Sequence, residues 1–312
     1  MPTLPKLIAV VGPTASGKTS LGIALAQKFD GEIVSADSRQ IYRGMDIGTA
    51  KASREELASV PHHLVDIRNP DEEYTVVDFK RDAVAAIDDI VARGKLPIVV
   101  GGTGLYVKSL LENLDIPKIK ADPALRAAIE KDIAIEGLAA VFEKLVALDP
   151  EAAYIVDPKN PRRIVRALEV ALITGKPFTA QRVKSEPRYN SLEIGINPPP
   201  DLLRERIDRR IDQMVADGLV NEVKNLLKKY QRTDSLAASQ PSSLPIAFDA
   251  IGYREIIDHL AGRMALDEAV AAIKLNTWHF AKRQVTWFKK DKNIQWIAEP
   301  TEAIKICNNF LR

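Results

Sequence analysis

The chain has 312 residues, of which 46% are hydrophobic and 28% are charged, proportions that exclude a disordered or membrane-embedded chain. Because 44 basic residues nearly balance 42 acidic ones, the net charge of +2 barely favours a polyanion partner, and any nucleic-acid site must arise from local clustering. The single cysteine, Cys307, excludes an intrachain disulfide and a cysteine-built zinc site.

The first hundred residues alternate between strand-like and helix-like segments. Buried strands are predicted at 7–11, 32–36, 63–67 and 96–100, and helices at 20–29 and 78–93. This alternation favours the α/β class, with a parallel sheet flanked by helices. The earliest apolar run is too short for a signal or membrane segment, so we expect a cytoplasmic protein without membrane contact, and a monomer by default.

From about residue 117 the strand-like runs stop and the pattern becomes helical. Asp122-Pro123, Asp149-Pro150 and Asn160-Pro161 each predict the start of a helix, and the last of these helices is expected to end at Gly175. The chain then returns to the sheet with a strand at 192–196, a long helix from 201 towards 230, a loop at 233–245 and a short strand at 294–297. We therefore predict a core of residues 1–116 and 191–312, interrupted by a helical insertion domain at 117–190.

A phosphate-binding loop follows the first predicted strand. The run Gly12-Pro13-Thr14-Ala15-Ser16-Gly17-Lys18-Thr19 matches G-x-x-x-x-G-K-[ST] between a strand and a helix, which predicts a P-loop NTPase-like sheet. Its backbone N–H groups and Lys18 would hold phosphate oxygens, and the Thr19 hydroxyl would ligate Mg²⁺. The alternative is a glycine loop that only joins strand to helix. The motif does not tell whether the phosphates belong to ATP, GTP or a diphosphate.

Two polar residues follow other predicted strands. Asp37 comes after 32–36 and Thr103 after 96–100. Because ligands bind outside the carboxyl ends of parallel strands, both are expected near the phosphate loop. Asp37 is either a general base or magnesium ligand, or else an Asx-turn or helix-cap residue. Thr103 either joins this site or only caps the helix expected to follow it.

Several long motifs in a fixed order carry a resemblance that spans nearly the whole chain. They are GPTASGKT at 12–19, Asp37-Ser38, IYRGMDIGTAK at 41–51, PHHLVDI at 61–67, GGTGLY at 101–106, RRIVRALEV at 162–170, AIGYRE at 250–255 and AKRQVTWF at 281–288. With these motifs the chain resembles the bacterial tRNA dimethylallyltransferase (tRNA isopentenyltransferase) family.

The resemblance implies transfer of a dimethylallyl group from dimethylallyl diphosphate to the amino group of an adenosine next to the anticodon of tRNA. It implies that Asp37 is the general base, that Thr103 positions it, and that the phosphate loop with Mg²⁺ holds the diphosphate leaving group. Arg206 is the implied clamp on the diphosphate. The alternative for Arg206 is a solvated basic helix face, because Arg204, Arg209 and Arg210 crowd the same segment.

The resemblance also implies a tRNA-binding surface made of several separate segments. Its residues are Asp37, Ser38, Arg39, Gln40, Arg126, Arg162, Arg163, Ile164, Val165, Arg166, Gly252, Tyr253, Arg254, Lys282, Arg283, Gln284, Trp287 and Lys289. For the arginines at 162–166 the alternative is an ion pair with Asp157 or Glu169. For Trp287 it is an anchor in the core.

One other class of enzyme fits the first hundred residues. A P-loop nucleoside or nucleotide kinase would use Asp37 as base for a hydroxyl, and the arginines at 162–166 on the transferring phosphoryl group. It leaves the basic, tryptophan-containing segment at 278–292 unexplained. A non-catalytic RNA-binding module would in turn leave Lys18, Thr19, Asp37 and Thr103 without a role.

Overall fold

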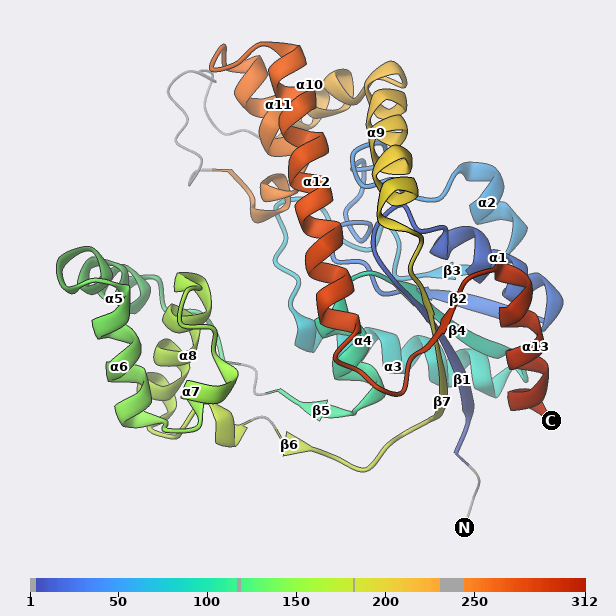
Figure 1. Cartoon of the computed structure of the whole chain (residues 1–312), viewed down its shortest axis with the longest axis horizontal. Coiled ribbons are helices and arrows are strands. Elements are labelled where there is room, and N and C mark those ends of the chain that lie inside the picture. The colour runs from blue at the N-terminus through green and yellow to red at the C-terminus, as the bar shows by residue number, and fades with distance from the viewer. Residues whose placement is uncertain (1–3, 117–118, 182, 231–243) are drawn as a thin grey trace. The chain divides into compact units, whose positions relative to one another are not determined.

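A parallel sheet of six strands forms the centre of the larger part of the chain (Figure 1). The structure is a computed structural model that describes residues 4–116, 119–181, 183–230 and 244–312. The strands lie in the order β3-β2-β4-β1-β7-β8, and every neighbouring pair is parallel. Their bounds are β1 Lys6–Val11, β2 Gly31–Ser35, β3 His62–His63, β4 Leu96–Gly101, β7 Asn190–Ile196 and β8 Gln295–Ile297. The predicted α/β class with a P-loop-like parallel sheet is confirmed.

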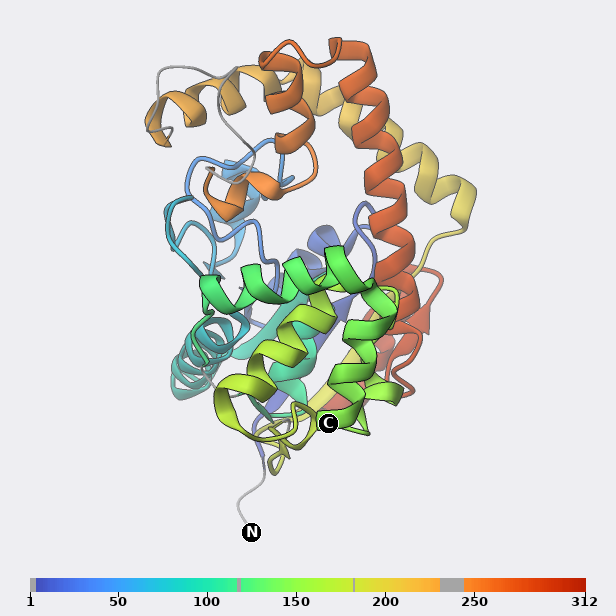
Figure 2. The ribbon, with the colours of Figure 1, turned by 90° about the vertical axis from the view of Figure 1, so that its left-hand side faces the viewer.

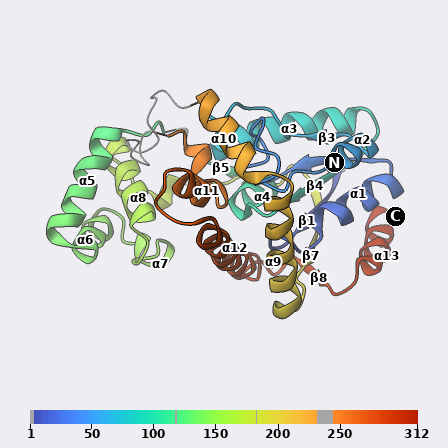
Figure 3. The same ribbon diagram turned by 90° about the horizontal axis from the view of Figure 1, so that it is seen from above.

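Helices cover both faces of this sheet, which explains why its strands are apolar without alternation. Along β1, Leu7, Ala9 and Val11 join a core shared with α3 (Val76–Ala92) and α4 (Gly104–Leu111). The intervening Ile8 and Val10 join a second core with α1 (Lys18–Lys28) and α13 (Pro300–Leu311). Figure 3 shows α1 and α13 on one side of the strands.

The remaining helices of this part, except the short one at 54–59, which has no buried residue, contribute to the first core. They are α2 Arg54–Ser59, α9 Pro200–Ala216, α10 Leu219–Tyr230, α11 Tyr253–Leu260 and α12 Leu266–Phe288, with a 3-10 turn, η3, at Ile246–Asp249. The long α12 packs against α9, α11 and α4 (Figures 1 and 3). No helix within the described residues is long and apolar enough to cross a membrane.

Two predictions from the sequence are wrong at places where the backbone is left-handed. The single helix expected from 201 towards 230 is two helices, because Gly218 has φ 101° and ends the first of them. The strand expected at 63–67 stops at His63, because Leu64 and Asp66 have φ of 63° and 55° and cannot continue a strand. Most of the loop expected at 233–245 lies outside the described residues.

A second compact unit comprises residues 112–187, while 1–111 and 188–312 form the first. The expected insertion, 117–190, overlaps the second unit along most of its length. Figure 2 shows its helices as a bundle. Its elements are β5 Leu114–Asp115, α5 Pro123–Glu136, α6 Leu138–Leu148, α7 Ala152–Ile155, α8 Pro161–Thr174, η1 Thr179–Gln181 and β6 Val183–Lys184. Ile129, Val141, Leu145 and Leu168 belong to a separate core of this unit.

Side-chain caps explain two of the three predicted helix starts in this unit. The Asp122 carboxylate accepts from the N–H groups of Ala124 and Leu125, and the Asn160 side chain accepts from that of Arg163. Asp149 behaves differently, since its carboxylate accepts from the backbone and hydroxyl of Thr179 at 2.8 and 2.7 Å. The helix expected at Asp149-Pro150 is the single turn α7.

At the amino ends of the strands, Glu32 provides a test of fold stability. Its carboxylate is 2% exposed, lies 2.7 Å from Nε2 of His63 and pairs with the Arg93 guanidinium. The hydrogen bonds from Arg93, helped by His63, lower the pKa of Glu32 to about 2 although burial opposes them. Because the folded-state pKa lies below the unfolded one, this stabilisation is present above about pH 4.3 and is lost as pH falls towards 2.

Glu32→Gln is expected to lower the free energy of unfolding at neutral pH by roughly 1–3 kcal/mol, since it removes a charged hydrogen-bond acceptor. Urea unfolding at pH 7 and at about pH 3.5 checks this, because the difference between variant and wild type should shrink at the lower pH. Glu205→Gln, at an exposed position of α9, is the control. An equal difference at both pH values would contradict the assignment.

Candidate active site at the carboxyl ends of the strands

Loops from four neighbouring strands meet at one edge of the sheet. The register pairs Val11 of β1 with Gly101 of β4 and with Gly195 of β7, so the segments that follow these strands start at one level. The backbones approach so closely that side chains do not fit. A Cβ at Gly12 would lie 2.3 Å from the carbonyl oxygen of Ile196, and one at Gly101 would lie 2.2 Å from that of Ala36. This edge is where the sequence placed the phosphate loop, Asp37 and Thr103.

The loop at 12–19 has the form of an anion site. Gly12 and Gly17 take positive φ values of 148° and 95°, and Lys18 is the first residue of α1. The Ser16 hydroxyl is buried, and the described residues offer it no hydrogen-bond partner. Burial lowers the pKa of Lys18 to about 8, Asp37 opposes the shift and Arg210 adds to it. A desolvated ammonium and an unpaired buried hydroxyl are what a bound phosphate group would satisfy.

A basic row on α9 lines a cleft beside this loop. The cleft includes Ser16 and Gly17 of the loop together with Arg206, Arg209 and Arg210. Burial lowers the pKa of the Arg210 guanidinium, and the positive charge of Arg210 acts on Lys18. Arg206, the clamp implied by the resemblance, lies in this cleft. Arg210, one helical turn further along, is an additional cation that the sequence reasoning did not select, although the spacing of four residues could have indicated it.

Asp37 and Thr103 lie together through Ser38. The Asp37 Oδ1 atom accepts from the N–H groups of Arg39 at 2.8 Å and Gln40 at 3.3 Å. Thr103 Oγ1 accepts from the N–H of Ser38 at 3.1 Å, and the Thr103 N–H donates to the carbonyl oxygen of Ala36 at 3.2 Å. The Asx-type turn expected as the alternative for Asp37 is present, but it uses only one carboxylate oxygen. Within the described chain Oδ2 takes no hydrogen bond, so it is available to a proton.

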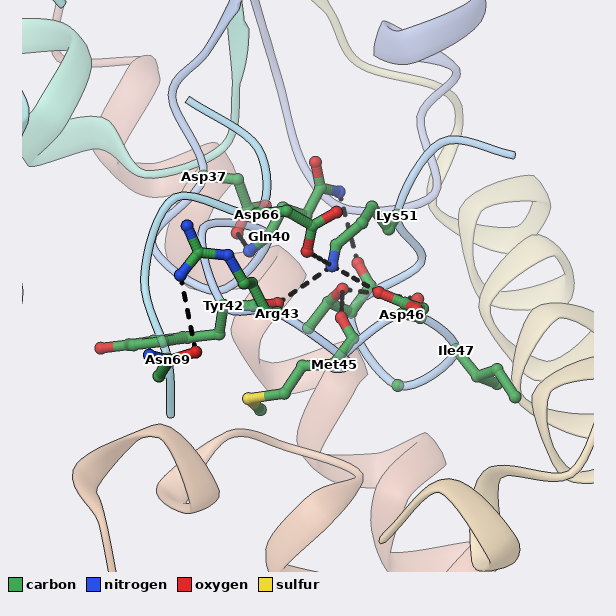
Figure 4. Close-up of polar contacts among 12 residues, drawn as sticks. Asp37, Gln40, Tyr42, Arg43, Met45, Asp46, Ile47, Lys51, Asp66 and Asn69 are labelled. Atoms are coloured by element: carbon green, nitrogen blue, oxygen red, sulfur yellow. Dashed lines mark hydrogen bonds and ion pairs between the residues drawn. The ribbon is translucent and has the colours of Figure 1, made fainter. Parts of the chain in front are cut away.

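Polar contacts within the segment from Asp37 to Lys51, and between it and neighbouring loops, hold the segment in place (Figure 4). The Gln40 amide donates to the carbonyl oxygens of Thr49 and Ala50 at 3.4 and 3.2 Å. The Lys51 ammonium lies 2.5 Å from Asp46, 2.6 Å from Asp66 and 3.0 Å from the carbonyl oxygen of Tyr42, with only 4% of its side chain exposed. Lys51 thus fixes the loop that carries Asp37. Arg39, expected to contact tRNA, donates to the carbonyl oxygen of Ile246 at 3.1 Å.

Tyr253, expected to contact tRNA, has a structural role in this loop. The ring is fully buried, and its hydroxyl donates to Glu222 Oε1 at 2.6 Å. Burial, reinforced by Glu222, raises the pKa of Tyr253. Glu222 also accepts from three successive N–H groups, those of Asp46, Ile47 and Gly48, at 2.7–3.1 Å. Tyr253 therefore supports the loop of Asp46, together with buried Gly252, while Arg254 beside them is exposed.

The basic carboxyl-terminal part of α12 presents two different faces. Lys282, Arg283 and Lys289 are exposed, as a nucleic-acid surface requires. The Lys282 ammonium and the Arg204 guanidinium each lie 5.6 Å from the centroid of the Trp278 ring. Trp287 is partly buried against the main core and faces Gly104, which supports the core-anchor alternative.

Gln284, also expected to contact tRNA, is only 7% exposed. Its amide is hydrogen-bonded to Thr14 and Gly102. The sequence around Gln284 gave no signal of this orientation.

In the second unit, the arginines expected to bind tRNA are divided between solvent and a buried acid. Arg162 and Arg163 are exposed at the start of α8. Ile164 and Val165 are 0% and 6% exposed in the core of the unit, which corrects their expected contact with tRNA.

Arg126 and Arg166 both form ion pairs with Glu169. For Arg166 this is the alternative that the sequence offered. Arg126 makes two bonds to Glu169, of 2.9 and 3.0 Å, and Arg166 makes one of 2.5 Å. Burial acts to raise the pKa of Glu169, but the two guanidinium groups outweigh it and leave the pKa below its ordinary value. Glu169 thus aligns two arginines whose side chains remain more than a third exposed.

Mg²⁺ would find few protein ligands at this edge. No group of three histidine, cysteine, aspartate or glutamate side chains within the described chain is arranged to hold a metal ion. A phosphate-bound Mg²⁺ needs less, since it takes most of its ligands from phosphates and water. Thr19, half-buried beside Lys18 on the first turn of α1, offers the expected hydroxyl.

Comparisons with known proteins agree over almost the whole length. The family model described as IPP transferase matches residues 40–291. A tRNA dimethylallyltransferase of Roseiflexus sp. is 48% identical over 92% of this chain and 91% of its own length, and one of Geobacter metallireducens is 48% identical over 98% and 96%.

Solved structures give the same result. The full-length tRNA isopentenylpyrophosphate transferase of Bacillus halodurans is 41% identical and matches with a TM-score of 0.69 over 98% of this chain and 95% of its own. A eukaryotic dimethylallyltransferase, solved while acting on tRNA, is 28% identical and matches with a TM-score of 0.79 over 98% of this chain and 79% of its own.

Proposed function

The chain belongs to the IPP transferase family, and on this premise we propose that it transfers a dimethylallyl group from dimethylallyl diphosphate to N6 of the adenosine 3′-adjacent to the anticodon in tRNA, releasing diphosphate. The observation that carries the proposal is the meeting of Asp37 and Thr103 with the phosphate loop at one edge of the sheet.

The leaving group is the first chemical problem, because cleavage of the allylic C–O bond places negative charge on the diphosphate. We assign its stabilisation to the N–H groups of the phosphate loop, Lys18, Arg210 and Arg206. Lys18 and Arg210 are already desolvated, so their interaction with an anion is stronger than in water. Bound beside the Thr19 hydroxyl, Mg²⁺ would neutralise part of the same charge.

The nucleophile is the second problem, because the lone pair of an adenine amino group is delocalised into the ring. We assign to Asp37 Oδ2 the proton that N6 loses as the C–N bond forms. The other oxygen, Oδ1, is held by the N–H groups of Arg39 and Gln40, which fixes the direction of Oδ2. Thr103 acts through its bond to Ser38 and keeps the Asp37 turn against the end of β4.

The exposed cations of α12 supply part of the proposed tRNA surface. Replacing both Lys282 and Arg283 with glutamine is expected to weaken tRNA binding and to reduce the slope of log K against log salt by about 1–2, because up to two phosphate contacts are lost. Binding measured at several salt concentrations checks this. Lys28→Gln combined with Lys305→Gln, two exposed lysines on α1 and α13, is the control. An unchanged slope would remove Lys282 and Arg283 from the interface.

The acceptor distinguishes the proposed reaction from the kinase alternative. Unmodified tRNA, free adenosine and AMP should be offered in parallel with labelled dimethylallyl diphosphate and Mg²⁺, and ATP with nucleosides in a separate reaction. The proposal predicts label in tRNA alone. Label on AMP would indicate an adenylate prenyltransferase, and ATP consumption on a nucleoside without prenyl transfer would indicate a kinase.

A further inference from the structure

We propose that Gln284 is a positioning residue that locks the diphosphate-binding loop to the loop of Thr103 and thereby sets the distance between leaving group and general base. Its Oε1 accepts from the N–H of Thr14 at 2.8 Å, and its Nε2 donates to the carbonyl oxygen of Gly102 at 2.9 Å. The inference rests on the proposed function for its chemical meaning, but the bridge itself is a feature of the fold.

The bridge joins three segments that are distant in the chain. Gln284 belongs to α12, Thr14 to the loop after β1 and Gly102 to the loop after β4. Figure 1 shows α12 running past this edge of the sheet, where it also packs on α4. Ala281 and Phe288 are buried on the same face of α12 as Gln284. The amide is thus presented by a long helix that is itself anchored in the core.

The chemistry of the two partners leaves little choice of side chain. A backbone N–H can only donate and a carbonyl oxygen can only accept, so the bridging group must offer one acceptor and one donor. A carboxylate lacks the donor, and an aliphatic side chain lacks both. The two partners also determine which end of the amide is oxygen. Without the amide, the half-buried Thr14 N–H and the buried Gly102 carbonyl oxygen would both lose these bonds, which is costly.

The loop around Gly102 is shaped to receive this helix. A Cβ at Gly102 would lie 2.3 Å from the Gln284 amide nitrogen, and a Cβ at Gly104 would lie 2.1 Å from the indole nitrogen of Trp287. Glycine at both positions lets α12 approach the loop on either side of Thr103. The approach therefore fixes the residue that holds Ser38 and the Asp37 turn.

A continuous path of contacts follows from these bonds. It runs from Thr14 in the phosphate loop through the amide to Gly102, then along the backbone to Thr103, Ser38 and Asp37. Prenyl transfer needs N6, the allylic carbon and the leaving oxygen in line, and displacement by about 1 Å can cost about 10² in rate. Loosening the bridge should therefore reduce turnover more than it affects the affinity for tRNA.

Gln284→Met tests this, because methionine has nearly the same size and makes neither hydrogen bond. We expect kcat to fall by about 10- to 100-fold while the KM for tRNA changes by less than about twofold. Inorganic diphosphate should bind several-fold more weakly, because the phosphate loop is less preorganised. Gln295→Met, at an exposed position of β8, is the matched control and should leave all three quantities unchanged.

Gln284→Glu provides a readout that a loss of folded protein would not produce. The ionised carboxylate cannot donate to Gly102 and repels the diphosphate, whereas the protonated acid offers both a donor and an acceptor. The ratio of variant to wild-type kcat should therefore rise as pH is lowered from about 8.5 to about 6. Loss of fold would leave the ratio flat or make it fall.

The outcomes separate this inference from the proposed function. Wild-type kcat in Gln284→Met with a raised KM for tRNA would mean that the amide reads RNA, and would overturn the inference. A pH-independent ratio in Gln284→Glu, with a circular dichroism spectrum and melting temperature like those of the wild type, would overturn it as well. If the wild type transferred no prenyl group, the proposed function would fail. The affinity of Gln284→Met for diphosphate would still test the bridge: a weaker affinity would support it, and an unchanged affinity would contradict it.

Discussion

Asp37→Asn is expected to lower kcat by about 10² or more, with little change in tRNA affinity. Asparagine keeps an oxygen that can accept from the N–H groups of Arg39 and Gln40, so the turn that precedes the loop to Lys51 should remain. What it removes is the second carboxylate oxygen, which we assign as acceptor of the proton from N6. The substitution therefore separates the role of base from that of turn residue, two alternatives that the sequence left open.

Single-turnover kinetics with saturating tRNA measure this effect without a contribution from product release. Asp71→Asn, at an exposed position, is the control. Turnover within a few-fold of wild type in Asp37→Asn would remove Asp37 as the base. It would leave the structural role of the turn as the explanation of this residue.

Lys18→Met is expected to lower kcat by about 10²–10³ and to weaken binding of dimethylallyl diphosphate, because one preorganised positive charge at the leaving group is lost. The side chain is half-buried beside the carbonyl oxygen of Pro13, to which its ammonium donates at 2.5 Å. Methionine fills a similar volume, so packing should be retained. Lys28→Met, at the exposed end of α1, is the control.

The pH dependence of diphosphate binding gives a second test of Lys18. Its pKa in the free protein is lowered to about 8 by burial, so the ammonium is charged below that pH and neutral above it. Since an anion binds the charged form, affinity for dimethylallyl diphosphate should fall as pH rises through about 8 in the wild type. The ratio of wild-type to Lys18→Met affinity should approach a constant at high pH. A ratio that does not change with pH would contradict this assignment.

Local patterns were sufficient to predict the sheet and the phosphate loop. The apolar runs of β1 and β4 and the glycine-lysine spacing at 12–19 are written within a few successive residues, and the structure places them where expected. Asp37 and Thr103 were predicted to meet because the ends of parallel strands share an edge. The turns at Leu64 and Gly218 were missed, because single left-handed residues leave no periodic signal.

Contacts between distant segments could not be predicted from the sequence. Glu222 accepts from the N–H groups of 46–48, and Gln284 joins Thr14 to Gly102. Nothing in the sequence of the helices that carry Glu222 and Gln284 indicates these contacts. The resemblance implied tRNA contacts for Gln284 and Tyr253 because a motif identifies a whole segment. It does not tell which face of a helix is buried. Exposure in the structure separates them from Lys282 and Arg283.

The most direct measurement is nucleoside analysis of a tRNA that carries an unmodified adenosine 3′-adjacent to its anticodon, after reaction with labelled dimethylallyl diphosphate and Mg²⁺. We expect all label in one product, N6-(dimethylallyl)adenosine, and none when guanosine replaces that adenosine. Label in a different nucleoside, label that persists after the replacement, or no label in tRNA at all would contradict the proposed reaction.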